Sequence, residues 1–323
     1  MSFDHNLDIQ ECNVLKKRYI RPLCASSICG RIPSYYKGGK GEGCLIAHTL
    51  LSLYEYERIR EKILSILARI VKRELKRKES VKEYDINTIY CLLDVTLTLT
   101  ILLHDVGKLS TQYGKNRKFR HEVLSSIYAW LLLEEYYNRL NNSLKHIVNV
   151  LKLQNQVASS ILLHHESFYW RELEELPTYI DLTHVVSRYI YKYKPLEYEM
   201  YKMFVEALLP NLIKYKLVSE ETLKGIKLLN DVIMRVYNAW EDVNKIMSRI
   251  GESGEIRINN LVLPLYYILF LIDNRAASAR DKYWEEIYVN NINTKGDYEA
   301  LIKNIFKTGG SQILHVSIAL LPL

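Results

Sequence analysis

The sequence has little glycine and proline, an odd number of cysteines, and no long apolar run free of polar residues. Its 13 glycines and 7 prolines, set against 25 tyrosines and many Ile, Lys and Glu residues, are typical of proteins from microbes of hot environments. Hydrophobic residues make up 48% of the 323 positions, so the chain can bury the core of one large or two modest domains. This composition excludes intrinsic disorder.

By length, residues 86–103 are a candidate membrane span, but they contain Asn87, Asp94 and several threonines. A transmembrane helix needs about 20 mostly apolar residues, and ionisable residues inside one are rare. The segment is therefore predicted to be a buried core helix. Residues 1–17 are polar and of mixed charge, unlike a signal peptide. We expect a soluble, cytoplasmic protein with no membrane partner.

The cysteines do not follow the spacing of a zinc ribbon. Four of the five lie within the first 44 residues, at Cys12, Cys24, Cys29 and Cys44. A zinc site and a disulfide are the alternatives for this group. The simplest interpretation is that these cysteines are free structural thiols.

Apolar residues recur at helical spacing through most of the chain, which predicts an all-α fold. The expected helices cover residues 44–78, 86–109, 119–139, 142–163, 178–193, 195–217, 220–250 and 266–284. A small β-hairpin is predicted near 253–263, where apolar and polar residues alternate around an Asn-Asn turn. These boundaries divide the chain into an N-terminal extension (1–43), a main domain (44–288) and a C-terminal tail (289–323).

Two loops are rich in positive charge, and the formal net charge of +7 favours polyanionic partners. Residues 35–43 form a glycine-rich loop that could contact a phosphate but lacks the GK[ST] ending of a nucleotide-binding loop. Residues 110–120 hold two aromatic side chains and four basic ones, Lys115, Arg117, Lys118 and Arg120. Basic residues interleaved with aromatic rings suit a single-stranded nucleic acid, and a solvated loop is the alternative.

Histidines and aspartates stand at the edges of apolar segments, where burial would be expensive unless they are paired or bind a cation. His104 and Asp105 end one apolar run, with Gly107 as the expected helix stop, and an adjacent His pair ends another. The predicted two-metal site consists of His48, His104, Asp105, His121, His164, His165 and Asp273. The other histidines are assigned structural or surface positions, at His5, His146, His184 and His315.

In this order the residues resemble the HD superfamily of metal-dependent phosphohydrolases, an all-helical fold named for an adjacent His-Asp pair. The order of the motifs, with one His between that pair and the His doublet, resembles the members of the superfamily that bind two metal ions. Phosphodiesterases of HD-GYP type carry a Gly-Tyr-Pro element after the doublet, whereas residues 167–172 here read Ser-Phe-Tyr-Trp-Arg-Glu. Residues 271–278 look like the Asp-Arg-x-Ala-Ser element of CRISPR-associated HD nucleases of type I systems, with one extra residue, so Asp273 alone transfers.

The resemblance covers about residues 43–280 and implies an HD-domain helical bundle that binds two divalent metal ions. His48, His104 and Asp273 would hold one ion, the other three histidines would hold the second, and Asp105 would bridge them. Imidazole and carboxylate ligands suit Mn, Fe, Co or Ni, and Mg stays open. Two cations about 4 Å apart can activate water and hold a phosphodiester. The residues implied to be catalytic are Asp105, which would bridge the cations, and Lys108. Lys108 would neutralise charge on the scissile phosphate.

The implied activity is a nuclease that hydrolyses phosphodiester bonds of single-stranded DNA in CRISPR interference. Because the sequence contains no helicase motif, the expected partners are a separate helicase subunit and a guide-RNA surveillance complex. The chain could instead be a module of a larger effector, as in type I-D systems. Two other functions stay open: an HD-type nucleotide or cyclic-dinucleotide phosphohydrolase, and a non-catalytic subunit stabilised by its metal ions.

Overall fold

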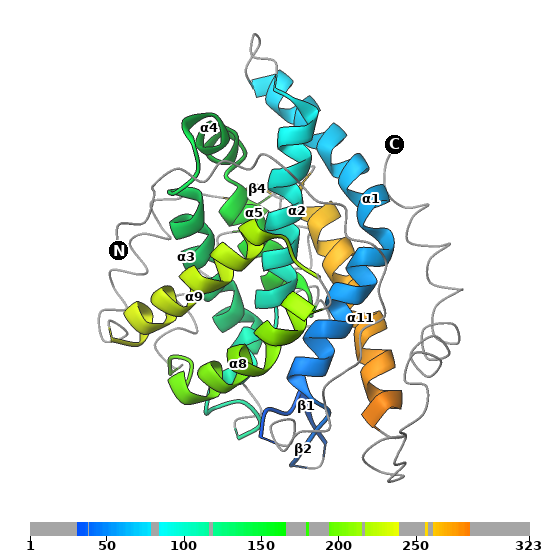
Figure 1. Ribbon diagram of the computed structural model, residues 1–323, viewed down its shortest axis with the longest axis vertical. Helices are drawn as coiled ribbons and strands as arrows, with labels where there is room; N and C mark the ends of the chain where they lie inside the picture. Colours follow the sequence, from blue (N-terminus) through cyan, green and yellow to red (C-terminus); the bar gives the residue numbers. More distant parts are fainter. Residues whose placement is uncertain are drawn as a thin grey trace.

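The computed structural model describes residues 31–37, 39–78, 84–115, 119–165, 179–180, 194–214, 217–238, 256–257 and 261–284. These residues are mostly α-helical, with two short antiparallel strand pairs, which confirms the predicted all-α class (Figure 1). The helices are α1 (Leu45–Lys78), α2 (Ile86–Leu103), the 3-10 turn η1 (Val106–Leu109), α3 (His121–Tyr137), α4 (Asn142–Leu151), α5 (Leu153–Leu163), α8 (Tyr198–Lys214), α9 (Glu220–Asn238) and α11 (Val262–Trp284).

Both strand pairs are short. Strand β1 (Tyr35–Lys37) pairs with β2 (Lys40–Glu42) just before α1. Strand β3 (Tyr179–Ile180) pairs with β4 (Ile256–Arg257). β4 lies where a hairpin was expected, at 253–263, but its partner is distant in sequence and not the neighbouring arm. The remaining residues of that range up to 260 lie outside the described part of the chain.

Three helix predictions need correction. The expected helix at 86–109 ends at Leu103 and continues as a 3-10 turn. The expected helix at 142–163 breaks at Lys152, which has a φ of 49° and donates its N–H to carbonyls in the last turn of α4. A left-handed residue in this place ends a helix, and it is more often glycine. The expected helix at 178–193 contains strand β3, and its other residues lie outside the described ones.

Helix α2 is the central element of the bundle. It packs against α1, α3 and α9, while α11 lies against both α1 and α5 (Figure 1). Within the described residues, one segment is apolar and long enough to cross a membrane, Ile86–Leu109, and 78% of its apolar window is buried inside the protein. That degree of burial is the pattern of a core helix.

Cys44 and Cys91 are buried, and each takes part in a disulfide bond. The expectation of a free thiol is therefore wrong for Cys44. Cys12, Cys24 and Cys29 lie outside the described residues. No finding tests the predicted domain boundaries, which stay predictions.

A buried ion pair joins α1 to α2. Arg60 Nε donates to Asp94 Oδ1 at 2.6 Å and Arg60 Nη2 donates to Asp94 Oδ2 at 2.5 Å. The hydroxyl of Tyr56 also donates to Asp94 Oδ1, at 2.8 Å. Asp94, the charged residue of the apolar helix, is thus fully compensated. Because the two helices run antiparallel, this contact also sets the register that places His48 beside His104.

We expect Asp94→Ala to lower the free energy of unfolding by about 3–5 kcal/mol, because it leaves the Arg60 guanidinium buried without its partner. The measurement is chemical denaturation followed by circular dichroism. Glu61→Ala is the control, since Glu61 is exposed on the next position of α1. Its effect should stay within about 0.5 kcal/mol. Equal stability of the two variants would show that the ion pair does not hold the helices together.

Candidate metal centre

His104 lies directly after the last residue of α2. Its ring is fully buried, and its Nδ1 lies 2.7 Å from the carbonyl oxygen of Ile101. Carbonyls in the last turn of a helix have no partner inside the helix, so the ring nitrogen supplies one. This contact orients the ring so that Nε2 faces both Asp105 and Asp273. Burial would lower the pKa of His104, but the two carboxylates raise it, so a cation bound at Nε2 would replace a proton there.

His164 repeats this arrangement at the end of α5. Its Nδ1 contacts the carbonyl oxygen of Ile161, again three residues back. Its Nε2 is buried and has no hydrogen-bond partner among the residues that the structure describes. A buried polar atom is rarely left unsatisfied in a native protein. The donor set around this nitrogen therefore fits a bound cation.

Gly107 allows the turn after Asp105 to pack directly on the start of α3. A Cβ atom at Gly107 would lie 2.1 Å from the carbonyl oxygen of His121, so a side chain has no room there. The Gly107 N–H donates to Ser125 Oγ at 2.8 Å. This close approach brings Asp105 Oδ1 to 3.0 Å from His121 Nε2. Gly107 is therefore not the helix stop that was expected, because α2 ends earlier, at Leu103.

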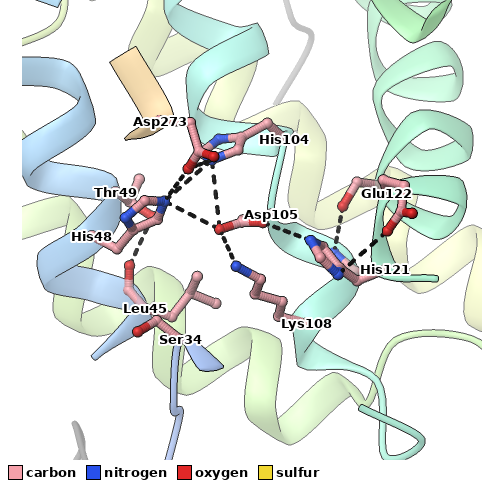
Figure 2. Close-up of polar contacts among 12 residues, drawn as sticks. Ser34, Leu45, His48, Thr49, His104, Asp105, Lys108, His121, Glu122 and Asp273 are labelled. Atoms are coloured by element: carbon pink, nitrogen blue, oxygen red, sulfur yellow. Dashed lines mark hydrogen bonds and ion pairs between the residues drawn. The ribbon is translucent and has the colours of Figure 1, made fainter. Parts of the chain in front are cut away.

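A first group of potential ligands surrounds Asp105 Oδ2. His48 Nε2 lies 3.2 Å from this oxygen and 2.9 Å from Asp273 Oδ1. His104 Nε2 lies 3.5 Å from the Asp105 oxygen and 3.4 Å from the Asp273 oxygen. Figure 2 shows His48, His104 and Asp273 converging on one side of Asp105. Helices α1, α2 and α11 supply these side chains.

A second group surrounds the other oxygen of the same carboxylate. Asp105 Oδ1 lies 3.0 Å from His121 Nε2 and 3.8 Å from His164 Nε2. His165 Nε2 lies 3.1 Å from His121 Nε2. Within each group the potential ligand atoms lie within 4.8 Å of one another, so each group could hold a metal ion. The structure brings all seven residues of the predicted site together, and their role as ligands stays a prediction.

Neighbouring charges keep both carboxylates ionised. Burial would raise the pKa of Asp105, but the nearby Lys108 and His104 hold it well below its usual value. Burial would likewise raise the pKa of Asp273, and hydrogen bonds from His104 and His48 hold it well below the ordinary value. Metal binding requires the deprotonated carboxylate. Both acids are therefore in the form that binds a cation.

Two histidines of the second group, His121 and His165, have pKa values shifted toward the neutral form. Burial lowers the pKa of His121, and the positive charge of Lys108 lowers it further. Burial together with the neighbouring His164 and His121 rings lowers the pKa of His165 well below its ordinary value. A neutral imidazole offers a lone pair to a metal ion, whereas an imidazolium does not.

Lys108, predicted to contact the scissile phosphate, lies against Asp105. Its Nζ is 2.6 Å from Asp105 Oδ2, and the side chain is largely buried (Figure 2). Lys108 also lines a pocket of about 570 Å³ that reaches both groups. The lysine therefore connects the shared carboxylate with the space that a substrate would enter.

Sequence reasoning missed much of the pocket wall. The side chains that it did not identify are Ser34, Tyr35, Tyr113, Phe270, Asn274 and Ala277. Tyr35 belongs to the glycine-rich stretch at 35–43, and Tyr113 belongs to the basic loop at 110–120. Both loops had been singled out for their charge, but only the fold shows that they meet at one pocket.

Two buried acids outside the predicted set support the histidines. Glu122 Oε2 lies 3.5 Å from His121 Nδ1, opposite the nitrogen that faces Asp105. Glu55 forms a buried ion pair with Arg275, two residues beyond Asp273, and so joins α1 to α11 beside the first group. A charged residue inside an apolar helical face was the available signal for both acids.

The predicted nucleic-acid contacts differ in their surroundings. Lys115 is exposed. Arg120 is half-buried, with Nη1 lying 3.7 Å from Glu122 Oε1, so it also contributes to the support of His121. Arg117 and Lys118 lie outside the described residues.

No family model matches the chain, and no curated protein matches it. Among solved structures, it is similar to the CRISPR-associated Cas3 HD domain protein from Methanocaldococcus jannaschii, with 23% identity and a TM-score of 0.34. The match covers 69% of this chain and 94% of that chain. A TM-score this low does not establish a common fold, so the chemistry proposed below rests on this chain's own side chains.

We expect the wild-type protein to bind two Mn²⁺ ions per chain, His165→Ala to bind one, and Asp105→Ala to bind fewer than one, because Asp105 serves both groups. Titration calorimetry and metal analysis after gel filtration measure the stoichiometry. His146→Ala is the control, because His146 stacks on Tyr84 with ring centroids 6.3 Å apart and belongs to neither group. Retention of two ions by Asp105→Ala would contradict the shared carboxylate.

The other histidines that were assigned structural or surface positions, His5, His184 and His315, lie outside the described residues.

Proposed function

We propose that the protein is a divalent-metal-dependent nuclease that hydrolyses phosphodiester bonds of single-stranded DNA. The observation that carries the proposal is the Asp105 carboxylate. Its two oxygens face two separate His/Asp groups beside a pocket of about 570 Å³. This is the donor arrangement that two-metal phosphodiester hydrolysis requires.

The donor set fits divalent ions with an affinity for nitrogen. Five imidazoles and two carboxylates make up the two groups, which suits Mn, Fe, Co or Ni, with Mg also open. When bound, two such ions would lower the pKa of a water molecule and stabilise negative charge on a phosphoryl group. His104 and His164 need no rearrangement to bind them, because backbone carbonyls already orient their rings.

The chain's own residues perform the remaining tasks. Lys108 sits between the shared carboxylate and the pocket, where its ammonium group can contact a non-bridging oxygen of the scissile phosphate. His121, His165 and Asp273 line the pocket directly, whereas His48 and His104 lie fully buried behind them. A phosphate in the pocket would therefore face residues of both groups and the ammonium group of Lys108.

A polymeric substrate fits the surroundings of the pocket. Tyr113 and Phe270 supply aromatic faces in its wall, and Lys115 is exposed two residues beyond Tyr113. A single strand presents bases and phosphates together, and aromatic rings next to positive charge bind both. The order of the motifs supports a role in CRISPR interference in the cytoplasm, with a partner helicase and a guide-RNA surveillance complex supplying the opened strand.

The direct test is cleavage of a circular single-stranded DNA, which has no ends, with Mn²⁺, Ni²⁺ and Mg²⁺ in turn. We expect the wild-type protein to nick the circle and Asp105→Ala to lose at least about 1,000-fold in rate, because both groups lose a donor. His146→Ala should match the wild type. Cleavage that is unaffected by Asp105→Ala would exclude this centre as the active site.

Two further assays on the same protein, one with small phosphoesters and one of thermal stability after chelation, separate the two alternative functions. Hydrolysis of nucleotides or cyclic dinucleotides without cleavage of the circle would identify a small-molecule phosphohydrolase. Loss of thermal stability on chelation, with no phosphoester of any size cleaved, would identify a non-catalytic subunit stabilised by its metal ions.

We expect Lys108→Ala to lower kcat for the circle on the order of 100-fold while the protein still binds two ions, because the lysine is not a metal ligand. Single-turnover kinetics combined with metal analysis measure both quantities. Lys72→Ala is the control, since Lys72 is exposed on α1, about 36 Å along the helix from His48. An unchanged kcat in Lys108→Ala would show that the lysine serves only to neutralise Asp105.

A further inference from the structure

We propose that the β1–β2 hairpin is the part of the protein that holds the DNA strand next to the metal centre. Tyr35 would stack on the base beside the scissile phosphate, and Lys37 and Lys40 would bind the next phosphates of the backbone. This inference rests on the proposed function and adds the surface and the residues that recognise the strand.

The hairpin is docked firmly beside the centre. The hydroxyl of Tyr113 donates to the carbonyl oxygen of Ser34 at 2.8 Å, and the N–H of Leu45, the first residue of α1, donates to the carbonyl oxygen of Ile32 at 3.0 Å. Figure 1 places β1 and β2 at the end of α1 that carries His48, and Ser34 lines the pocket beside the metal centre. The hairpin and the metal centre are therefore held in one rigid arrangement.

Gly114 is essential to this docking. It has a φ of +78°, which favours glycine, and a Cβ atom at this position would lie 2.3 Å from the ring of Tyr36. Tyr36 also packs edge-on against Tyr113 at 5.3 Å, and Tyr113 packs against His121 at 5.6 Å. A continuous set of aromatic contacts thus runs from the hairpin to a predicted metal ligand.

Alternation along β1 divides its side chains between two faces. Tyr36 packs against the 110–115 loop, so Tyr35 and Lys37 lie on the opposite face of the strand. Tyr35 lines the pocket. Lys40 pairs directly with Lys37 across the hairpin and therefore shares its face. The face that carries the pocket tyrosine is the face that carries both lysines.

The two lysines create a local excess of positive charge. Both are exposed and stand directly opposite each other, an arrangement that destabilises a two-stranded ribbon because like charges repel. Glu42 occupies the same face but stands opposite Tyr35, at the other end of the pair, and does not line the pocket. A polyanion bound across Lys37 and Lys40 removes this repulsion, whereas a neutral small molecule does not.

An aromatic ring in the pocket followed by two cations suits an unpaired strand better than a duplex. Base stacking on a tyrosine tolerates any base, because every base has a π-face, and it requires that the base be free of its complement. The lysines contact phosphates and carry no sequence information. We therefore expect binding that depends on strandedness and salt but not on sequence.

The test compares Lys37→Ala/Lys40→Ala with Lys62→Ala/Lys72→Ala, which removes the same charge from exposed positions of α1 far from the pocket. Two substrates are used with each protein and Mn²⁺: a short fluorescent single-stranded DNA and bis(p-nitrophenyl) phosphate, a small diester that reaches only the metal centre. We expect kcat/KM for the strand to fall at least about tenfold in the hairpin variant alone. Its dependence on salt should weaken by about 1.4 in the log–log slope, about 0.7 for each lost phosphate contact. Hydrolysis of the small diester should not change.

Tyr35 is tested in the same assay. Tyr35→Ala should lower kcat/KM for the strand about tenfold, and Tyr35→Phe should restore it, because stacking needs the ring and not the hydroxyl. Duplex DNA of the same sequence should be a poor substrate for every variant.

The outcomes separate the two proposals. If the wild type cleaves the strand and both the hairpin variant and Tyr35→Ala match the α1 control, the hairpin inference is wrong and the nuclease stands. If the wild type cleaves neither the strand nor the small diester with any of the metals, the proposed function is wrong and the hairpin inference falls with it.

Discussion

The geometry of the centre depends on one buried carboxylate, that of Asp105. A carboxylate removed from water is unstable unless charges and hydrogen bonds replace the lost solvation. Asp105 obtains this compensation on Oδ2, from His48 and Lys108, whereas Oδ1 lies 3.0 Å from His121 Nε2 and has no hydrogen-bond partner among the described residues. Because these residues come from different helical segments, their contacts with Asp105 bring the ends of those segments together. The convergence is what makes the centre and the pocket beside it.

The register between α1 and α2 is the second condition for the site. Arg60 and Asp94 form their ion pair about three turns away from the centre. Since the helices are antiparallel, moving along α1 toward its start and along α2 toward its end leads from this pair to His48 and His104, whose Nε2 atoms lie 3.4 Å apart. The same aspartate that argues against a membrane span in the sequence thus has a structural purpose inside the core.

The sequence points to the candidate centre because four of the predicted ligands lie at the ends of apolar runs. Burial of a His-Asp pair after residues 86–103 and of a His doublet after residues 153–163 would cost free energy without polar partners or a cation. The structure brings both pairs to one place. Contacts between distant segments are not visible in this way. The strand partner of Ile256–Arg257, the close approach of Gly107 to His121, and the left-handed Lys152 all depend on tertiary packing that no local pattern encodes.

The glycine-rich stretch at 35–43 illustrates the same limit from the functional side. Its composition indicates flexibility, yet it folds into a hairpin because Tyr36 packs over Gly114, in a loop about 80 residues later. Composition identifies the charge on this segment but not the face on which the charge is displayed.

His104 and His164 share an arrangement that would make the centre selective among metal ions. Each ring follows the last residue of a helix and is oriented by a carbonyl three residues back, so the protein determines the direction in which Nε2 points before any ion is present. The donors cannot turn to follow the preference of the ion. A bound cation would have to accept the positions that the helix ends dictate, so ionic radius and preferred coordination geometry, rather than movement of the chain, would determine which metal the site retains.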